Sequence, residues 1–152
     1  LFIKAGVTPC GLGCRDTLRF EAGLPLYGHE LSEEINPIMA GLGVFVKLDK
    51  KDFVGKEAIQ HYKENPTKKI IGLELAEKSV PRAGYLVLDE NGKQVGIVTT
   101  GYISLSTGLP VCMALVNIEH STLGSKLFVK IRNKDFEATV INKQFYRKNY
   151  KK

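Results

Sequence analysis

The sequence predicts an α+β protein in which a helical first region is followed by a small six-stranded antiparallel β-barrel or two-sheet roll. The hydrophobic periodicity is helical, with Gly-rich turns, up to about residue 65, and it becomes strand-like beyond Lys68. Between the two lies Pro66, which ends a helix because it lacks an amide donor and pushes the preceding residue toward extended backbone. We therefore expect two regions, residues 1–65 and 68–152.

Length and composition are those of an ordinary globular protein. The chain has 152 residues, of which 43% are hydrophobic and 25% are charged, close to globular averages. A chain of this length buries about 70% of its unfolded surface, so it needs no disulfide to support a core. It begins at Leu1 without an initiator methionine or a leader, and we expect it to be part of a longer protein.

The first expected helix spans residues 14–22. Cys14, Leu18 and Ala22 recur at the four-residue spacing of one helix face. Gly23 follows directly, at the position where a left-handed C-terminal cap is common. This segment should therefore be a helix of about two turns that ends at Gly23.

Two further helices should precede Pro66. Asn36 and Pro37 form a good N-cap and first-turn pair, so a short helix should open there before a strand-like stretch at residues 44–48. A longer helix should run from near Val54 until Pro66 ends it. Its apolar side chains recur at helical spacing and should form one buried stripe, which consists of Ala58, Ile59 and Tyr62.

The rest of the chain should form short strands joined by tight turns. Asn91 and Gly92 both accept positive φ, which makes them a strong hairpin signal. Apolar and basic residues alternate between residues 126 and 132, so one face of that strand should point inward. Six strands within about 80 residues suggest a compact barrel or roll, and we expect them at residues 70–75, 85–88, 94–100, 111–117, 126–132 and 136–142.

The distribution of charge argues against a nucleic acid partner, and the length of the apolar runs argues against a membrane partner. The net charge is +6, but five of the 22 basic side chains fall within residues 143–152, where no acid occurs, leaving 17 basic against 16 acidic residues elsewhere. A nucleic-acid-binding surface carries its positive charge as a stripe across the fold. No apolar run approaches the ~20 residues that span a bilayer. We expect neither partner.

Cysteines and histidines give no sign of a metal site. Three cysteines cannot close a disulfide framework, which favours a reducing compartment such as the cytoplasm. Cys10 and Cys14 are four residues apart but have no further cysteine or histidine nearby, and the three histidines are scattered. We therefore expect no metal.

Other motifs are too incomplete to define an active site. Gly11-Leu12-Gly13 opens a helix, but the third glycine and the lysine of phosphate-binding motifs are missing, so a tight helix-entry turn is the better interpretation. Ser104 and Ser106 lie in no nucleophile elbow. The residues alone therefore predict an α+β fold without a complete catalytic constellation.

A resemblance adds a function to this fold. Residues 9–31 resemble the aminomethyltransferase of the glycine cleavage system, the T-protein family. This segment begins with Pro-Cys-Gly-Leu-Gly-Cys-Arg-Asp-Thr-Leu-Arg. The similarity continues through Gly-Ile-Val-Thr-Thr-Gly at residues 96–101 and Phe-Tyr-Arg at residues 145–147. It implies that residues 1–65 are the end of an α/β folate-binding lobe and that residues 68–152 are a C-terminal β-barrel or jelly-roll domain.

The resemblance also implies a reaction. The family moves an aminomethyl group from the lipoylated H-protein to tetrahydrofolate and releases ammonia, in the cytoplasm or, in eukaryotes, in the mitochondrial matrix. Its catalytic aspartate belongs to the N-terminal half, so we expect this portion to be inactive alone and expect no catalytic residue in it. Asp16 should instead favour the helix N-terminus and pair with Arg19 three residues later.

Two folate-binding residues are implied by the same resemblance. Arg15 matches the arginine of the family's Gly-x-x-Arg-Asp segment, and its planar fork of donors suits the carboxylates and carbonyls of a folate. The alternative is an arginine that binds carbonyl groups within the fold. Tyr150 matches a tail tyrosine that closes over the ligand. The chain departs from the family at Val44, where tryptophan is frequent.

Two other functions stay open at this stage. One is a non-catalytic module that binds folate or an acidic carrier protein, with its basic C-terminal tail as the contact. The other is the tail domain of a folate-dependent demethylase or oxidase, which shares the fold and differs in what precedes it.

Overall fold

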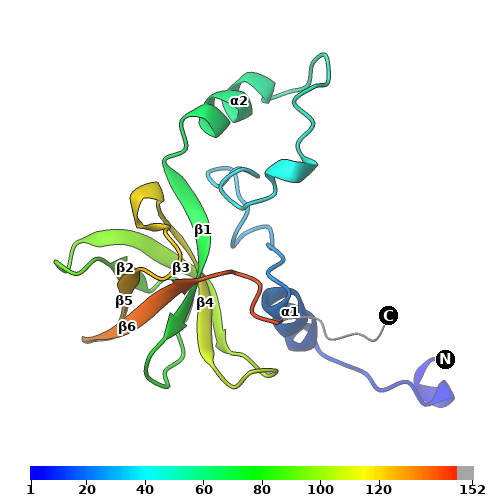
Figure 1. The fold of residues 1–152 in the computed structure, drawn as a ribbon. Coiled ribbons are helices and arrows are strands. Elements are labelled where there is room, and N and C mark those ends of the chain that lie inside the picture. Colours follow the sequence, from blue (N-terminus) through cyan, green and yellow to red (C-terminus); the bar gives the residue numbers. More distant parts are fainter. Residues whose placement is uncertain (147–152) are drawn as a thin grey trace.

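The computed structural model describes residues 1–146, which form a closed β-barrel, one helix on its wall and a projecting segment (Figure 1). The two α-helices are α1 (Leu12–Glu21) and α2 (Lys56–Glu64). Three short 3-10 turns lie at Ile3–Ala5, Gly43–Phe45 and Ile118–His120. The strands are β1 (Lys68–Leu75), β2 (Leu86–Leu88), β3 (Gln94–Ile103), β4 (Pro110–Asn117), β5 (Lys126–Ile131) and β6 (Lys134–Ile141).

These elements confirm the predicted fold class. All six expected strands are present, with ends that differ from the expected ones by three residues or fewer. They close in the order β1-β4-β3-β2-β5-β6, and every neighbouring pair is antiparallel. Because β1 pairs with both β4 and β6, the sheet has no open edge. The structure is thus a barrel and not a two-sheet roll.

The barrel core consists of the inward-facing side chains of all six strands. The expected alternation in β5 is confirmed, because Leu127, Val129 and Ile131 are buried while Lys126 and Lys130 are exposed. A glycine lets the neighbouring backbone approach closely, since a Cβ at Gly101 would lie 2.0 Å from the carbonyl oxygen of Pro81. The core side chains are Ile71, Leu73, Leu75, Val87, Val95, Val98, Cys112, Ala114, Val116, Leu127, Val129, Ile131, Ala138 and Val140.

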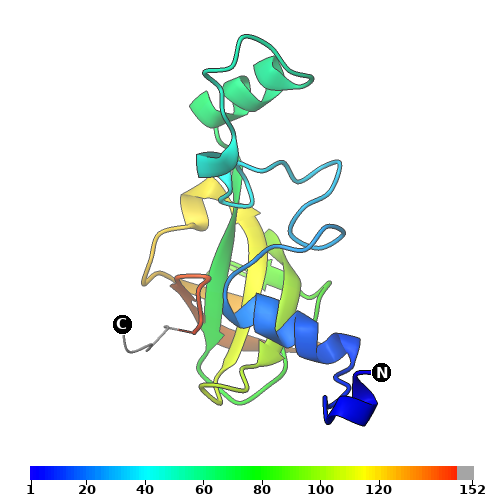
Figure 2. The same cartoon turned by 90° about the vertical axis from the view of Figure 1, so that its right-hand side faces the viewer.

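Helix α1 packs on the outside of this barrel (Figure 2). Phe20, which is 1% exposed, is its anchor and contacts outward-facing residues of β1 and β4. Its ring meets Tyr102 of β3 edge-on, with ring centroids 5.3 Å apart, and Phe145 with centroids 4.7 Å apart. The contacted wall residues are Ile70, Val111 and Met113. A second apolar cluster therefore fastens α1 to the barrel wall.

The projecting segment corrects two predictions from the sequence. Residues 44–48 form no strand, because they have no neighbouring strand to pair with in the described chain, and Gly43–Phe45 is a 3-10 turn instead. At Asn36 the predicted N-cap is present, since its Oδ1 accepts bonds from the amides of Ile38 (2.9 Å) and Met39 (3.0 Å). A single turn follows in place of the expected short helix, and it ends at Gly41, whose φ is +74°.

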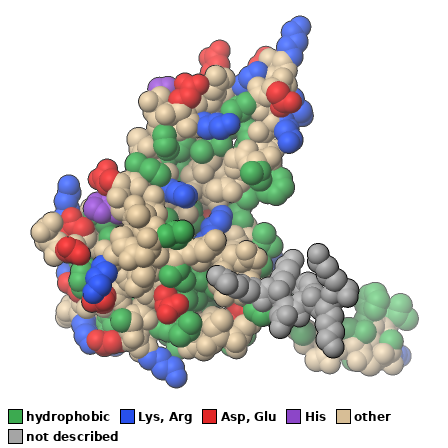
Figure 3. Space-filling model, in the orientation of Figure 1, with side chains coloured by type: hydrophobic (Ala, Val, Ile, Leu, Met, Phe, Trp, Pro, Cys, Tyr) green, Lys and Arg blue, Asp and Glu red, His purple; other side chains and the backbone are tan. Residues whose placement is uncertain are grey.

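Helix α2 buries no side chain completely, which corrects the expected buried stripe. Ile59 and Tyr62 are half-buried and Ala58 is exposed, because the helix projects from the barrel on a loop and nothing described covers its apolar side (Figure 1). Figure 3 shows further apolar side chains on the projecting part and at the N-terminal end. Neither described helix is long and apolar enough to cross a membrane.

Candidate functional site

The candidate site is a hollow beside the first turn of α1. It has a volume of about 430 Å³, and Arg15 lies at its rim with an exposed side chain. Most of the lining surface comes from apolar and thiol groups. Of the two lining arginines, Arg19 is buried, so the hollow offers one exposed cationic side chain, that of Arg15, against a largely apolar wall. The lining residues are Cys10, Gly11, Cys14, Arg15, Leu18, Arg19 and Leu24.

Helix α1 has one face exposed at the hollow and one face buried against the barrel. Leu18, 65% exposed, faces the hollow, whereas Arg19, Phe20 and Glu21 are buried against the barrel. The four-residue spacing that predicted the helix thus marks its open face. Gly11, in extended backbone, is the N-cap, so Gly11-Leu12-Gly13 is a helix entry.

Arg19 connects this helix to the barrel through a buried ion pair. Its Nη1 atom lies 2.6 Å from Oε2 of Glu30, and the two side chains are 7% and 0% exposed. Nη2 donates to the hydroxyl of Thr100 at 3.1 Å. A buried charge pair requires such additional hydrogen bonds, because the desolvation of both ions must be offset. Arg19 is therefore a fixed point one helical turn beyond Arg15.

Glu30 is completely buried and its carboxylate is saturated with donors. Besides Arg19, it accepts bonds from the amide of Leu26 (3.1 Å) and from the hydroxyl groups of Thr99 (2.7 Å) and Thr100 (2.6 Å). These threonines are neighbours in β3, where consecutive side chains normally point to opposite faces. Both reach Glu30 because the pairing of β3 with β4 shifts by one residue between Val98 and Thr100, as in a β-bulge.

Asp16 joins α1 to β3 at a second point. Its Oδ1 accepts a bond from Nε of Arg19 at 2.7 Å, which is the pair expected from the sequence, and its Oδ2 accepts one from the hydroxyl of Tyr102. Burial acts to raise the pKa of Asp16, but the bonds from Tyr102 and Arg19 outweigh it and hold the pKa below its ordinary value. The bond to Asp16 raises the pKa of the Tyr102 hydroxyl.

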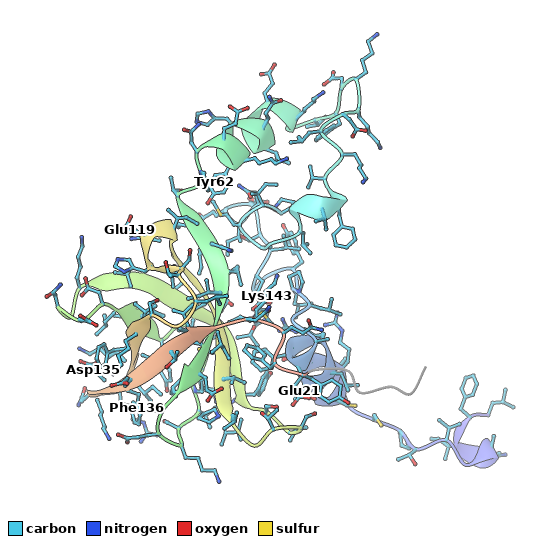
Figure 4. The ribbon with its side chains drawn as sticks, viewed as in Figure 1. Glu21, Tyr62, Glu119, Asp135, Phe136 and Lys143 are labelled. Carbon is cyan, nitrogen blue, oxygen red and sulfur yellow. The ribbon has the colours of Figure 1, made fainter. Side chains whose placement is uncertain are left out.

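Glu21 fixes the C-terminal end of α1 (Figure 4). Its carboxylate accepts bonds from the hydroxyl groups of Ser104 (2.6 Å) and Ser106 (2.5 Å) and from the amide of Ser106 (3.0 Å). Burial acts to raise the pKa of Glu21, but these hydrogen bonds more than compensate and lower the pKa. The two serines therefore have a structural role.

The chain after β6 passes close to the end of α1. Glycines make room for it: a Cβ at Gly23 would lie 2.8 Å from the carbonyl oxygen of Lys143, and a Cβ at Gly72 would lie 2.8 Å from that of Asn142. The ammonium of Lys143 donates to the carbonyl of Ala40 at 2.5 Å, and burial lowers its pKa. The amide of Tyr146 then donates to the carbonyl of Glu21 at 2.9 Å.

The two residues implied as folate contacts have different outcomes. Arg15 lies at the hollow, while Tyr150 lies outside the described residues. Reasoning from the sequence missed Glu30 and the two threonines; the pair of polar residues within an otherwise apolar strand was the available signal for a bulge. Between residues 1 and 146, no group of three or more His, Cys, Asp or Glu side chains is arranged to hold a metal ion.

Comparison with known proteins matches the barrel and the segment that precedes it to two family descriptions. Residues 68–147 match the family described as the glycine cleavage T-protein C-terminal barrel domain, and residues 3–50 match the GCVT N-terminal domain. The chain is 51% identical over 148 residues to an aminomethyltransferase of Thermoanaerobacter pseudethanolicus, and 49% identical over 144 residues to one of Halalkalibacterium halodurans. It covers 40% and 39% of their lengths.

A solved structure has the same fold. The glycine cleavage system aminomethyltransferase T from Bartonella henselae superposes with a TM-score of 0.88 at 31% sequence identity. The match covers 97% of this chain and 42% of the other. The present chain thus spans about two fifths of the length of the proteins that it resembles. The C-terminal barrel domain of the family matches more than half of the residues, and the solved structure from Bartonella henselae matches 97% of the chain. This chain therefore belongs to the glycine cleavage T-protein family.

Proposed function

We propose that this chain is the C-terminal portion of a tetrahydrofolate-dependent aminomethyltransferase of the glycine cleavage system, and that Arg15 binds the folate. One observation carries the proposal: an exposed arginine stands beside a mostly apolar hollow, on a helix that a buried ion pair fastens to the barrel. A site that must discriminate among ligands needs its polar contact held on a rigid element.

The chemistry of the hollow fits this ligand. A folate carries a flat ring system, carbonyl groups and carboxylates, and a guanidinium binds planar oxygen acceptors with two parallel hydrogen bonds. The apolar side chains of Leu18 and Leu24 offer a wall for the ring. Tyr150 is proposed as a second contact that closes over the ligand, supported by the course of the preceding chain, since Tyr146 already bonds to the end of α1.

The proton-transfer step is assigned to no residue of this chain. Glu30 is enclosed and holds four donors, and Asp16 holds Arg19 and Tyr102, so neither carboxylate is free to exchange a proton with a substrate. The proposed partner that delivers the aminomethyl group is the lipoylated H-protein, and the proposed setting is the cytoplasm. The free thiols of Cys10 and Cys14, both exposed, fit a reducing compartment.

The exposed apolar surface supports the proposed division into residues 1–65 and 68–152. Of the sixteen large apolar side chains that are exposed in the described chain, eleven lie within residues 1–65, among them Leu12 (88%), Val44 (75%) and Phe45 (75%). Large apolar side chains left in water usually mark a surface that another unit covers. The first region therefore belongs to a lobe whose remainder is contributed by preceding chain.

Tetrahydrofolate binding by the 152-residue chain tests the proposal. Loss of a charge-assisted hydrogen bond pair weakens binding by about ten- to a hundredfold, so Arg15→Gln should raise the dissociation constant by that factor in a calorimetric titration. Lys126→Gln removes an exposed cationic side chain outside the hollow and serves as the control, with an expected change below about twofold. Equal affinity of Arg15→Gln and the unchanged chain would overturn the assignment.

A turnover measurement tests the missing proton-transfer group. The chain alone, mixed with aminomethylated H-protein and tetrahydrofolate, should release ammonia no faster than the same mixture without the chain. Sustained ammonia release by the chain alone would show that a catalytic acid or base lies within it.

A further inference from the structure

A second pocket lies on the barrel, between the loop before β2 and the hairpin that joins β5 to β6. It is larger than the hollow at Arg15, with a volume of about 720 Å³, and the two share no lining residue. Three cationic side chains line it, from Arg82, Arg132 and Lys134. Two aromatic side chains, Tyr85 and Phe136, form its apolar wall and pack on the barrel core.

The lining carries uncompensated positive charge. None of the described lining residues is acidic, and Asp135 faces a different hollow because neighbouring side chains of β6 point to opposite faces (Figure 4). The ammonium of Lys134 is balanced, since it lies 2.8 Å from Oε2 of Glu77 and 4.7 Å from the ring centre of Phe136. Within residues 1–146, neither Arg82 nor Arg132 has an ion pair.

The position of Arg132 is unfavourable for a residue with a side chain. It is the first of two residues that connect β5 to β6, and its φ is +57°, the left-handed region that other non-glycine residues of the described chain avoid. Glycine is the favoured residue where the first position of a two-residue hairpin loop has positive φ. The turn therefore holds a guanidinium at the pocket rim at the expense of local backbone stability.

We propose that this pocket binds a small organic phosphate with a planar ring, the chemistry of a nucleoside monophosphate. The two unpaired guanidinium groups supply a charge of +2, which matches the charge of about −2 on a phosphate monoester near neutral pH better than the single charge of a carboxylate. The ring of Tyr85 takes the planar ring of the ligand by stacking, since the ammonium of Lys134 already lies over the ring of Phe136. This site is independent of the folate contact at Arg15.

A titration of the 152-residue chain with adenosine monophosphate, followed by amide NMR, tests the proposal. Shifts are expected in the β5–β6 hairpin and in the loop before β2. Adenosine and inorganic phosphate, each carrying half of the recognised chemistry, should bind at least about tenfold more weakly. Equal binding of inorganic phosphate would reduce the site to an adventitious ion only, and no binding of the nucleotide at millimolar concentration would refute it.

Two variants separate recognition from folding. Arg132→Gly removes the guanidinium and suits the positive φ, so it should weaken nucleotide binding at least about tenfold while the thermal midpoint stays the same or rises. Arg82→Gln should weaken binding similarly. Lys126→Gln, at the other end of β5, is the control and should change the affinity less than about twofold. Unchanged nucleotide affinity in both arginine variants, or arginine-dependent binding of an acidic peptide in place of the nucleotide, overturns the proposal.

Discussion

The guanidinium of Arg19 and the carboxylate of Glu30 lie 2.6 Å apart and are almost completely excluded from water. The pair joins α1 to a loop that β3 holds through two threonine hydroxyl groups. Arg15, one turn earlier on the same helix, is therefore oriented by contacts that it does not itself make. The stability of this pair and the packing around it can be tested directly.

Replacing Glu30 with glutamine should destabilise the chain strongly. The substitution removes the negative charge and leaves the guanidinium of Arg19 buried with only Asp16 to balance it, and breaking a buried ion pair in this way costs about 3–5 kcal/mol. Urea unfolding followed by circular dichroism measures the loss. Glu119→Gln, at an exposed carboxylate, is the control with an expected change of about 0–1 kcal/mol. Equal stability of the two variants would contradict the role given to the pair.

Gly23 should tolerate no side chain. Its φ is +72°, and a Cβ there would stand 2.8 Å from the backbone oxygen of Lys143. Gly92 is the matched control, because its φ is +75° and its surroundings are empty. Gly92→Ala should cost about 1–2 kcal/mol from the backbone conformation alone, and Gly23→Ala should cost a further 1–3 kcal/mol or so from the clash. Equal losses in thermal unfolding would show that the chain after β6 does not constrain α1.

The stability of the chain should fall as the pH is lowered through the acid range. The folded pKa of Glu21 lies below its ordinary value of 4.5, so its stabilising contribution is complete above that pH and is lost as the pH falls toward the folded pKa. Glu21→Gln cannot titrate, and its unfolding midpoint in urea should vary less between pH 5 and pH 3 than that of the unchanged chain. Parallel curves for the two proteins would rule out this contribution.

The three cysteines should differ in reactivity toward iodoacetamide. Cys10 and Cys14 are exposed, whereas Cys112 is buried in the barrel core and burial raises the pKa of its thiol. Because the thiolate is the reacting form, the native chain should gain two adducts in a mass spectrum and the urea-unfolded chain three. A third adduct on the native chain would indicate that the barrel opens on the timescale of the reaction.

Local patterns were sufficient to predict the strands and the positions of both α-helices. The alternation in β5 and the spacing at Cys14 and Leu18 are properties of the backbone period, which each segment carries in its own residues. The same spacing did not identify the buried face of α1, which is formed by Arg19, Phe20 and Glu21. The prediction of a strand at residues 44–48 was wrong for a related reason, since strand pairing depends on a neighbouring strand that the segment does not contain.

By itself, the sequence determined the order of the elements, the change from helix to strand around Pro66, the helix around Arg15 and the resemblance that suggested a function. Only the tertiary structure decided that Arg19, Glu30 and Thr100 share one buried network, and that the chain at Lys143 passes over Gly23. The physical reason is separation along the chain. A shift of one residue in the pairing of β3 with β4 aims two consecutive hydroxyl groups at one carboxylate some 70 residues earlier, and register between strands is a property of the closed barrel, not of either strand alone.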